Sequence, residues 1–317
     1  MARIHHSIRL TGQQGYGKEA PPVPVGNLLR LIAPAVRQAI LMGVVGRSRP
    51  LGRPPSWLVA ATDVRFVGID GGSQGETILH FEAPPLGEAA GELYRQQEFW
   101  PSRPPADDTG FDLLGDVLGD VTARREDSDR FDSPLLRGIG RFGKVLDRAY
   151  NRAIFAGHRY SEESPAVLDE ATIANAQQLD SETPMPQRVR VVGNLDMIRM
   201  SSQGFELLLD DGTPARGVLI EGDMASIKPL CGHRVLVQGL ATYRPSGRLL
   251  RIDADRVEPG EGVPDVWSVI PPPRERKLDT RQLLKPQGPS SGVSAFFGKW
   301  PGDETDEEWS EMIERLS

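Results

Sequence analysis

The runs Arg188-Val-Arg-Val-Val192 and Phe205-Glu-Leu-Leu-Leu209 decide the fold of this chain of 317 residues. The first alternates polar and apolar residues, which is typical of a half-buried strand, and the second predicts another strand. Asp210-Asp-Gly212 follows as a hairpin signal, because Asp-Gly tolerates the positive φ that such turns need. Gly193 predicts a bulge that continues the first strand to Met200. Three further strands are predicted at Arg216–Ile220, Arg234–Leu240 and Leu249–Ile252. A short helix is predicted at Asp223–Leu230, between the first two of them.

This order of three strands, one helix and two strands, with a bulged first strand, resembles an OB-fold from Arg188 to Glu258. The resemblance implies a closed five-stranded barrel, whose predicted core is Val189, Val191, Leu207, Leu209, Val218, Val235 and Val237. Many OB-folds bind single-stranded nucleic acid through aromatic residues in a basic groove. The residues that fit this role are Phe205, Tyr243, Arg244, Arg248 and Arg251. Alternatively, the three arginines surround a solvated hairpin tip, since ten basic and nine acidic residues leave this segment almost neutral.

Composition places the chain among ordinary soluble proteins, with 38% hydrophobic and 26% charged residues. Its net charge of −7 argues against bulk attraction to nucleic acid. A single cysteine, Cys231, excludes a disulfide scaffold and is interpreted as a small buried residue. The most apolar stretch, Leu28–Val45, contains Arg30 and Arg37, so we expect an amphipathic helix and no membrane partner. These features predict a cytoplasmic protein.

The fold class expected for the whole chain is α+β, in four parts. Residues 1–100 predict an α+β domain with the order β-α-β-β-α. Residues 101–186 predict a mainly helical connector that opens with a Pro-rich linker, and residues 187–260 form the OB-like barrel. Residues 261–317 predict a Pro-rich linker and an extended acidic tail with a short helix.

The sequence contains no recognisable motif of a catalytic, cofactor or metal site, so we expect no enzyme. Gly138–Gly143 matches a dinucleotide-binding pattern, but Pro134 breaks the strand that this fingerprint requires. His5 and His6 are neighbours on a predicted strand, so they point to opposite faces. Asp107 and Asp108 fall in the predicted linker.

The last residues predict an amphipathic helix. Thr305-Asp-Glu-Glu308 fits a capping box, and Trp309, Met312, Ile313 and Leu316 then form one apolar stripe. From Asp303 onward, seven acidic residues accompany a single arginine. An isolated helix of this length has only marginal stability in water. It therefore needs a surface on which to fold. That surface belongs either to the protein itself or to a partner.

The run Phe297-Gly-Lys-Trp-Pro-Gly-Asp-Glu-Thr-Asp-Glu-Glu308 resembles the tails of VapB-like bacterial antitoxins, which are paired with PIN-domain ribonuclease toxins. In that family the tail wraps the toxin and obstructs its active site. The resemblance implies partner-binding residues at Phe296, Phe297, Trp300, Trp309, Ile313 and Arg315. The leading expectation is therefore a non-enzymatic, antitoxin-like interaction protein in a toxin–antitoxin system. The alternative is a single-stranded nucleic-acid-binding protein that uses the OB-like barrel.

Overall fold

The computed structural model describes residues 2–50, 52, 54–95, 103–146, 149–161, 163–200 and 202–273. The chain divides into two units, Met1–Lys277 and Leu278–Ser317, and all of the described residues belong to the first. The predicted tail lies outside the described residues. So do its six partner-binding candidates, Phe296, Phe297, Trp300, Trp309, Ile313 and Arg315.

The N-terminal part is built on an antiparallel sheet with the strand order β2-β3-β1-β4-β5. Its strands are β1 (Ile4–Thr11), β2 (Arg65–Gly71), β3 (Thr77–Ala83), β4 (Arg152–Ala156) and β5 (Ala166–Asp169). Burial alternates along β1, where His6, Ile8 and Leu10 are buried between less buried neighbours. One face of the sheet therefore carries the core.

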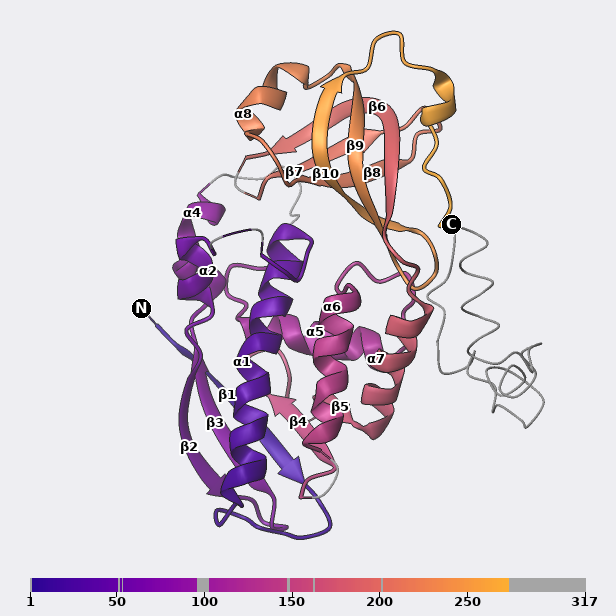
Figure 1. Ribbon diagram of the computed structural model, residues 1–317. Helices are drawn as coiled ribbons and strands as arrows, with labels where there is room; N and C mark the ends of the chain where they lie inside the picture. Colours follow the sequence, from indigo (N-terminus) through magenta and orange to yellow (C-terminus); the bar gives the residue numbers. More distant parts are fainter. Residues whose placement is uncertain are drawn as a thin grey trace, which may run out of the picture. The chain divides into compact units, whose positions relative to one another are not determined.

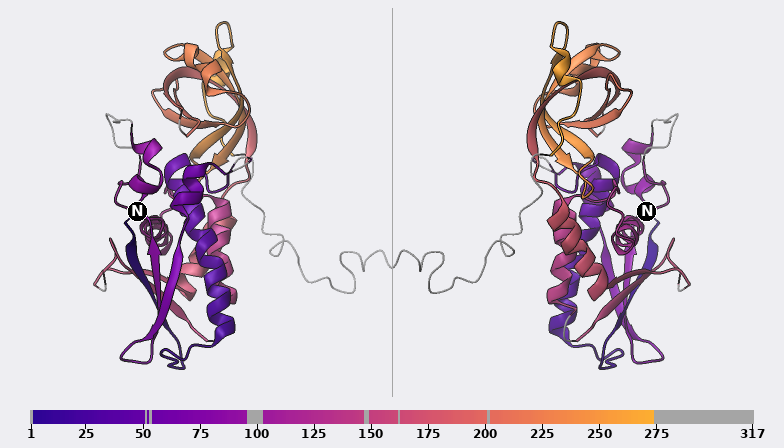
Figure 2. Two further views of the ribbon diagram at one scale, coloured as in Figure 1. Left: turned by 90° about the vertical axis from the view of Figure 1, so that its left-hand side faces the viewer. Right: turned by 90° about the vertical axis from the view of Figure 1, so that its right-hand side faces the viewer.

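Helices cover that face of the sheet (Figures 1 and 2). The longer ones are α1 (Pro22–Val45), α5 (Gly110–Thr122), α6 (Ser133–Gly140) and α7 (Glu170–Glu182). The short ones are α2 (Ser56–Ala61), α3 (Leu86–Ala89), α4 (Gly91–Tyr94) and the 3-10 turn η1 (Arg141–Lys144). Apolar residues of sheet and helices, among them Ile8, Ile40 and Leu118, join in a single buried cluster.

Helix α1 begins six residues before the predicted stretch Leu28–Val45 and ends with it at Val45. It begins at Pro22, because proline suits the first turn of a helix, and it ends where Gly46 adopts a left-handed φ of 78°. Among the described residues it is the one helix long and apolar enough to cross a membrane, by length and composition alone. Half of its most apolar window is buried inside the protein, as in a core helix.

The structure differs from the predicted division at residue 100. Strand β4 falls in the connector that was predicted as mainly helical, yet it pairs with β1 in the middle of the sheet. Strand β5 also falls there and pairs with β4. Residues on both sides of position 100 thus share one sheet and one core.

The C-terminal half contains a closed five-stranded barrel with the strand order β10-β8-β7-β6-β9 (Figure 1). Its strands are β6 (Gln187–Arg199), β7 (Gly204–Leu208), β8 (Pro214–Leu219), β9 (Arg234–Tyr243) and β10 (Leu249–Pro259). Helix α8 (Met224–Ile227) and the 3-10 turn η2 (Lys228–Leu230) lie between β8 and β9, and η3 (Asp265–Trp267) follows β10. All seven predicted core residues are buried.

The long strand β6 closes the barrel by pairing twice. Residues 187–194 pair with β9, and residues 194–199 pair with β7. Gly193 lies at this change of partner, where a Cβ would come within 2.9 Å of the Leu208 carbonyl oxygen. The predicted irregularity exists, but the register shift lies between Leu195 and Met197.

Candidate anion-binding cleft and acidic cluster

A cleft of about 550 Å³ lies between the barrel and the helical layer. The barrel contributes the end of β6, the strands β7 and β8, and the start of β10. The helical side contributes the end of α1, the segment before α5, part of α5 itself and Arg159. Among the described residues, the cleft is lined by six arginines, namely Arg103, Arg130, Arg159, Arg199, Arg216 and Arg251. Four acidic residues of the same described part also line it, so this described lining carries an excess of positive charge.

Arg251 is a fixed part of one wall. It is buried, and its guanidinium donates to Asp253 (2.9 Å), to Asp132 (3.3 Å) and to the carbonyl oxygen of Gly46 (3.0 Å). Asp132 caps α6 and also accepts from Ser48, so this network ties the barrel to the helical layer. Arg251 is a predicted nucleic-acid contact, but its Nε and Nη1 already donate hydrogen bonds within the protein.

A second set of contacts involves the predicted hairpin tip between β9 and β10. Ser246 donates to Asp127, and Arg248 pairs with the same carboxylate at 3.4 Å. Arg244 is partly buried, and its Nε has no hydrogen-bond partner among the described residues. The turn thus contacts the loop after α5 through Ser246 and Arg248, although about three quarters of the Arg248 side chain stays exposed.

The predicted stacking residues lie inside the barrel. Phe205 is 4% exposed and covers Gly217, where a Cβ would lie 2.1 Å from the ring. Tyr243 is 1% exposed, and its hydroxyl bonds with Gln187 and the carbonyl of Pro271. Neither ring presents a face on which a base can stack, since both belong to the barrel core. Cys231, by contrast, is exposed and not a buried residue.

The arginines that remain accessible come from both walls. Arg216 pairs with Asp129 at 3.0 Å, and about two thirds of its side chain is exposed. Arg130 pairs with Asp120 and is half exposed. Arg199, at the end of β6, lines the cleft with no hydrogen bond or ion pair to any described residue. An exposed ion pair such as Arg216–Asp129 contributes only about 0–1 kcal/mol, so an anionic ligand can displace it at small cost.

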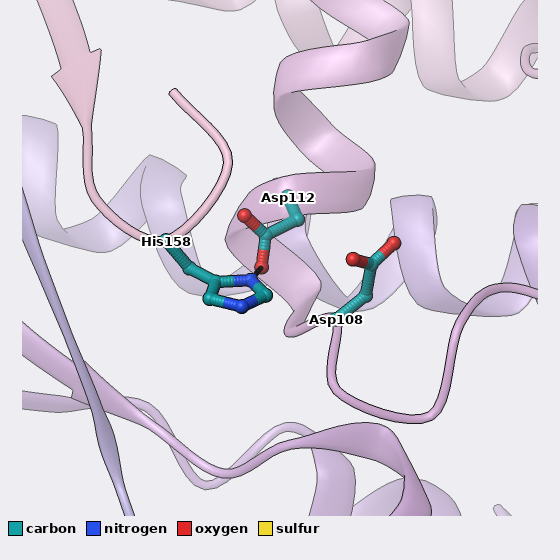
Figure 3. Close-up of side chains that lie close together, drawn as sticks. All are labelled: Asp108, Asp112 and His158. Carbon is teal, nitrogen blue, oxygen red and sulfur yellow. Dashed lines mark ion pairs between the residues drawn. The ribbon is translucent and has the colours of Figure 1, made fainter. Parts of the chain in front are cut away.

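An acidic cluster with one histidine adjoins the helical wall (Figure 3). Asp108 and Asp112 are both buried, and each offers an oxygen within 4.8 Å of a ring nitrogen of His158. The capping box of α5 positions Asp112, whose Oδ2 accepts from the amide and hydroxyl of Thr109. Its Oδ1 accepts from the amide of Arg159. The loop after β4 thereby brings His158 to the start of α5.

Asp108 is the least satisfied member of this cluster. Its Oδ2 accepts from Arg159 at 2.6 Å, whereas its buried Oδ1 has no partner among the described residues. Burial raises the pKa of Asp108, although the Arg159 guanidinium opposes this effect. Arg159 also contacts Asp116 one helical turn beyond Asp112, at 2.8 Å.

His6 contacts the cluster through Thr109. Its Nε2 is 3.0 Å from the Thr109 hydroxyl, which itself donates to Asp112. The Thr109 oxygen thus accepts from His6, which places the imidazole proton on Nε2. Burial lowers the pKa of His6 to about 4, and the nearby Asp112 carboxylate only partly offsets this. The predicted opposite orientation of the two histidines is confirmed, since His5 is exposed and faces His80.

Sequence reasoning missed this cluster because Asp107 and Asp108 fall in a Pro-rich stretch. A signal was present: Asp108, Asp112 and Asp116 recur every four residues, which places them on one side of a helix and its leading turn. No spacing rule links them to His158 and Arg159, which lie beyond two intervening helices.

Comparisons of the chain with protein-family models, with curated proteins and with solved protein structures each returned no match. The possible roles of the cleft and the cluster therefore rest on their own geometry.

Proposed function

We propose that this protein is a non-enzymatic binding protein of the cytoplasm, and that its cleft takes single-stranded nucleic acid. The observation that carries this proposal is the set of accessible arginines on both walls of the cleft, with Arg199 and Arg216 on the barrel side. A strand between the two walls can place its phosphates against both sets. The attraction is electrostatic, because phosphate contacts supply most sequence-independent affinity.

The strand order of the barrel supports an OB-fold assignment. Its third and fifth strands, β8 and β10, pair in parallel, while its other pairings are antiparallel. Oligonucleotides commonly bind OB-folds on the face of the second and third strands. In this barrel those strands are β7 and β8, and both line the cleft. With Phe205 buried, we expect binding with little base preference.

Fluorescence anisotropy with a labelled oligothymidylate tests this proposal. The double variant Arg199→Ala/Arg216→Ala should bind about tenfold more weakly or worse, because two phosphate contacts are lost. Arg256→Ala is the matched control, since Arg256 is an exposed barrel arginine paired with Glu258 that does not line the cleft. Absence of binding at low salt, or an equal loss in the control, would overturn the proposal.

A second proposal concerns the tail. Its apolar stripe at Trp309, Met312, Ile313 and Leu316 and its resemblance to VapB-like antitoxins favour a protein partner of the PIN-domain toxin class. The aromatic residues Phe296, Phe297, Trp300 and Trp309 are of the type that dominates interface energetics. Nucleic-acid binding at the cleft and partner binding by the tail use different residues, so both functions can coexist.

A further inference from the structure

We propose that Asp108, Asp112 and His158 bind one divalent cation of the Mn²⁺ type. The donor set is two carboxylates and one imidazole, which come from the residue before the α5 cap, the first turn of α5 and the loop after β4. Carboxylate oxygens suit Mn²⁺, and an imidazole adds affinity for first-row metals.

The donor atoms lie close enough for a shared ion. All three are within 4.8 Å of one another. Ligands on opposite sides of one ion are separated by roughly 4.2 to 4.8 Å for metal–ligand bonds of about 2.1 to 2.4 Å. Figure 3 shows the three side chains converging from different elements on one space. Small adjustments of the side chains therefore complete the coordination.

The unpartnered oxygen of Asp108 is evidence for a ligand that does not depend on this spacing. Asp108 is fully buried, and its Oδ1 has no hydrogen-bond partner among the described residues. A buried carboxylate oxygen without a partner carries a desolvation cost that a bound cation removes. Asp112 differs, because both of its oxygens already accept hydrogen bonds.

The local charge balance also favours a cation. His158 lies between Asp112 (3.6 Å) and Asp107 (3.8 Å), while Arg159 lies between Asp108 and Asp116. These four carboxylates thus lie beside one imidazole and the Arg159 guanidinium. About a third of the His158 side chain is exposed, so an ion can enter from solvent.

The direct test is titration of the full chain with Mn²⁺ alone, with free Mn²⁺ followed by electron paramagnetic resonance. We expect one bound Mn²⁺ per chain, at least about tenfold weaker binding in Asp108→Asn, and a clear loss in His158→Gln. His80→Gln is the control, because His80 also lies beside a carboxylate, at 2.9 Å from Asp70, but outside the cluster.

The His158→Gln variant keeps the test decisive if Asp108→Asn fails to fold, since His158 is partly exposed. No stoichiometric Mn²⁺ binding by the wild-type chain, or unchanged affinity in the folded variants, would overturn the proposal. The titration contains no nucleic acid, so its outcome is independent of oligonucleotide binding at the cleft.

Discussion

The buried imidazole of His6 makes stability depend on pH. Because burial lowers its pKa from 6.5 to about 4, the unfolded chain takes up a proton there before the folded chain does. Above pH 6.5 both states are neutral at this residue and the stability is fully present. It is lost as pH falls from 6.5 towards 4, by about 3 kcal/mol in total.

His6→Gln should therefore reduce the loss of unfolding free energy between pH 7 and pH 4 by up to about 3 kcal/mol. Urea denaturation at a series of pH values measures it. His5→Gln is the control, because His5 is exposed on the opposite face of the same strand. Equal pH dependence in wild type and His6→Gln would show that His6 does not titrate in this way.

Leu207 and Leu208 are neighbours on β7 with opposite surroundings. Leu207 is 0% exposed in the barrel core, whereas Leu208 is 40% exposed. Leu207→Asp should unfold the barrel, since an unpaired buried charge costs several kcal/mol, on the order of 3–5. Leu208→Asp should change the melting temperature little. Similar melting curves for the two variants would contradict the assigned register.

At the scale of elements, Gly193 lets one strand serve two partners. Gly193→Ala would press a methyl group against the Leu208 carbonyl, at a cost of about 1–3 kcal/mol. Gly119→Ala in α5 is the contrasting control, because its Cβ meets nothing within 4 Å and alanine favours helix by about 0.5–1 kcal/mol. Opposite shifts in melting temperature are expected. A neutral or stabilising Gly193→Ala would contradict the close approach.

Some of the strands could be predicted from the sequence and others could not. The five barrel strands could be predicted because alternation, Gly193 and the Asp-Gly turn all indicate the same structure. Strands β4 and β5 have only five and four residues, too few for alternation to stand out from the helical pattern around them. Their place in the sheet comes from pairing with β1, which is distant in sequence and leaves no local signal.

The candidate site shows the same limit. The sequence shows which residues are arginines and which are aromatic. It does not show whether the rings of Phe205 and Tyr243 face a binding groove or the barrel core. The cleft and the acidic cluster arise only when the barrel, α5 and the loop after β4 meet. Tertiary contacts of this kind are not encoded in any single run of residues.

At the scale of the whole molecule, we expect the described part to fold without the tail. The residues up to 273 already contain two buried apolar clusters, one in the α+β part and one in the barrel. Truncation after Pro289 should leave the melting temperature unchanged and abolish co-purification with the product of the adjacent gene. A sharp fall in melting temperature would show instead that the tail packs on its own body.

Point variants in the full chain test the proposed aromatic anchors of the tail. Trp300→Ala and Trp309→Ala should each abolish co-purification and restore the partner's nuclease activity, since each true hot spot contributes about 2 kcal/mol or more. Retained binding in both variants would reject the antitoxin-like proposal.

The salt dependence of oligonucleotide binding tests the central claim most directly. The logarithm of the association constant, plotted against the logarithm of salt concentration, falls with a slope of about −0.7 for each phosphate contact on a single strand. If Arg199 and Arg216 each bind a phosphate, the double alanine variant should show a slope shallower by about 1.4, and Arg256→Ala should match wild type. An unchanged slope in the double variant would show that the strand does not bind in this cleft.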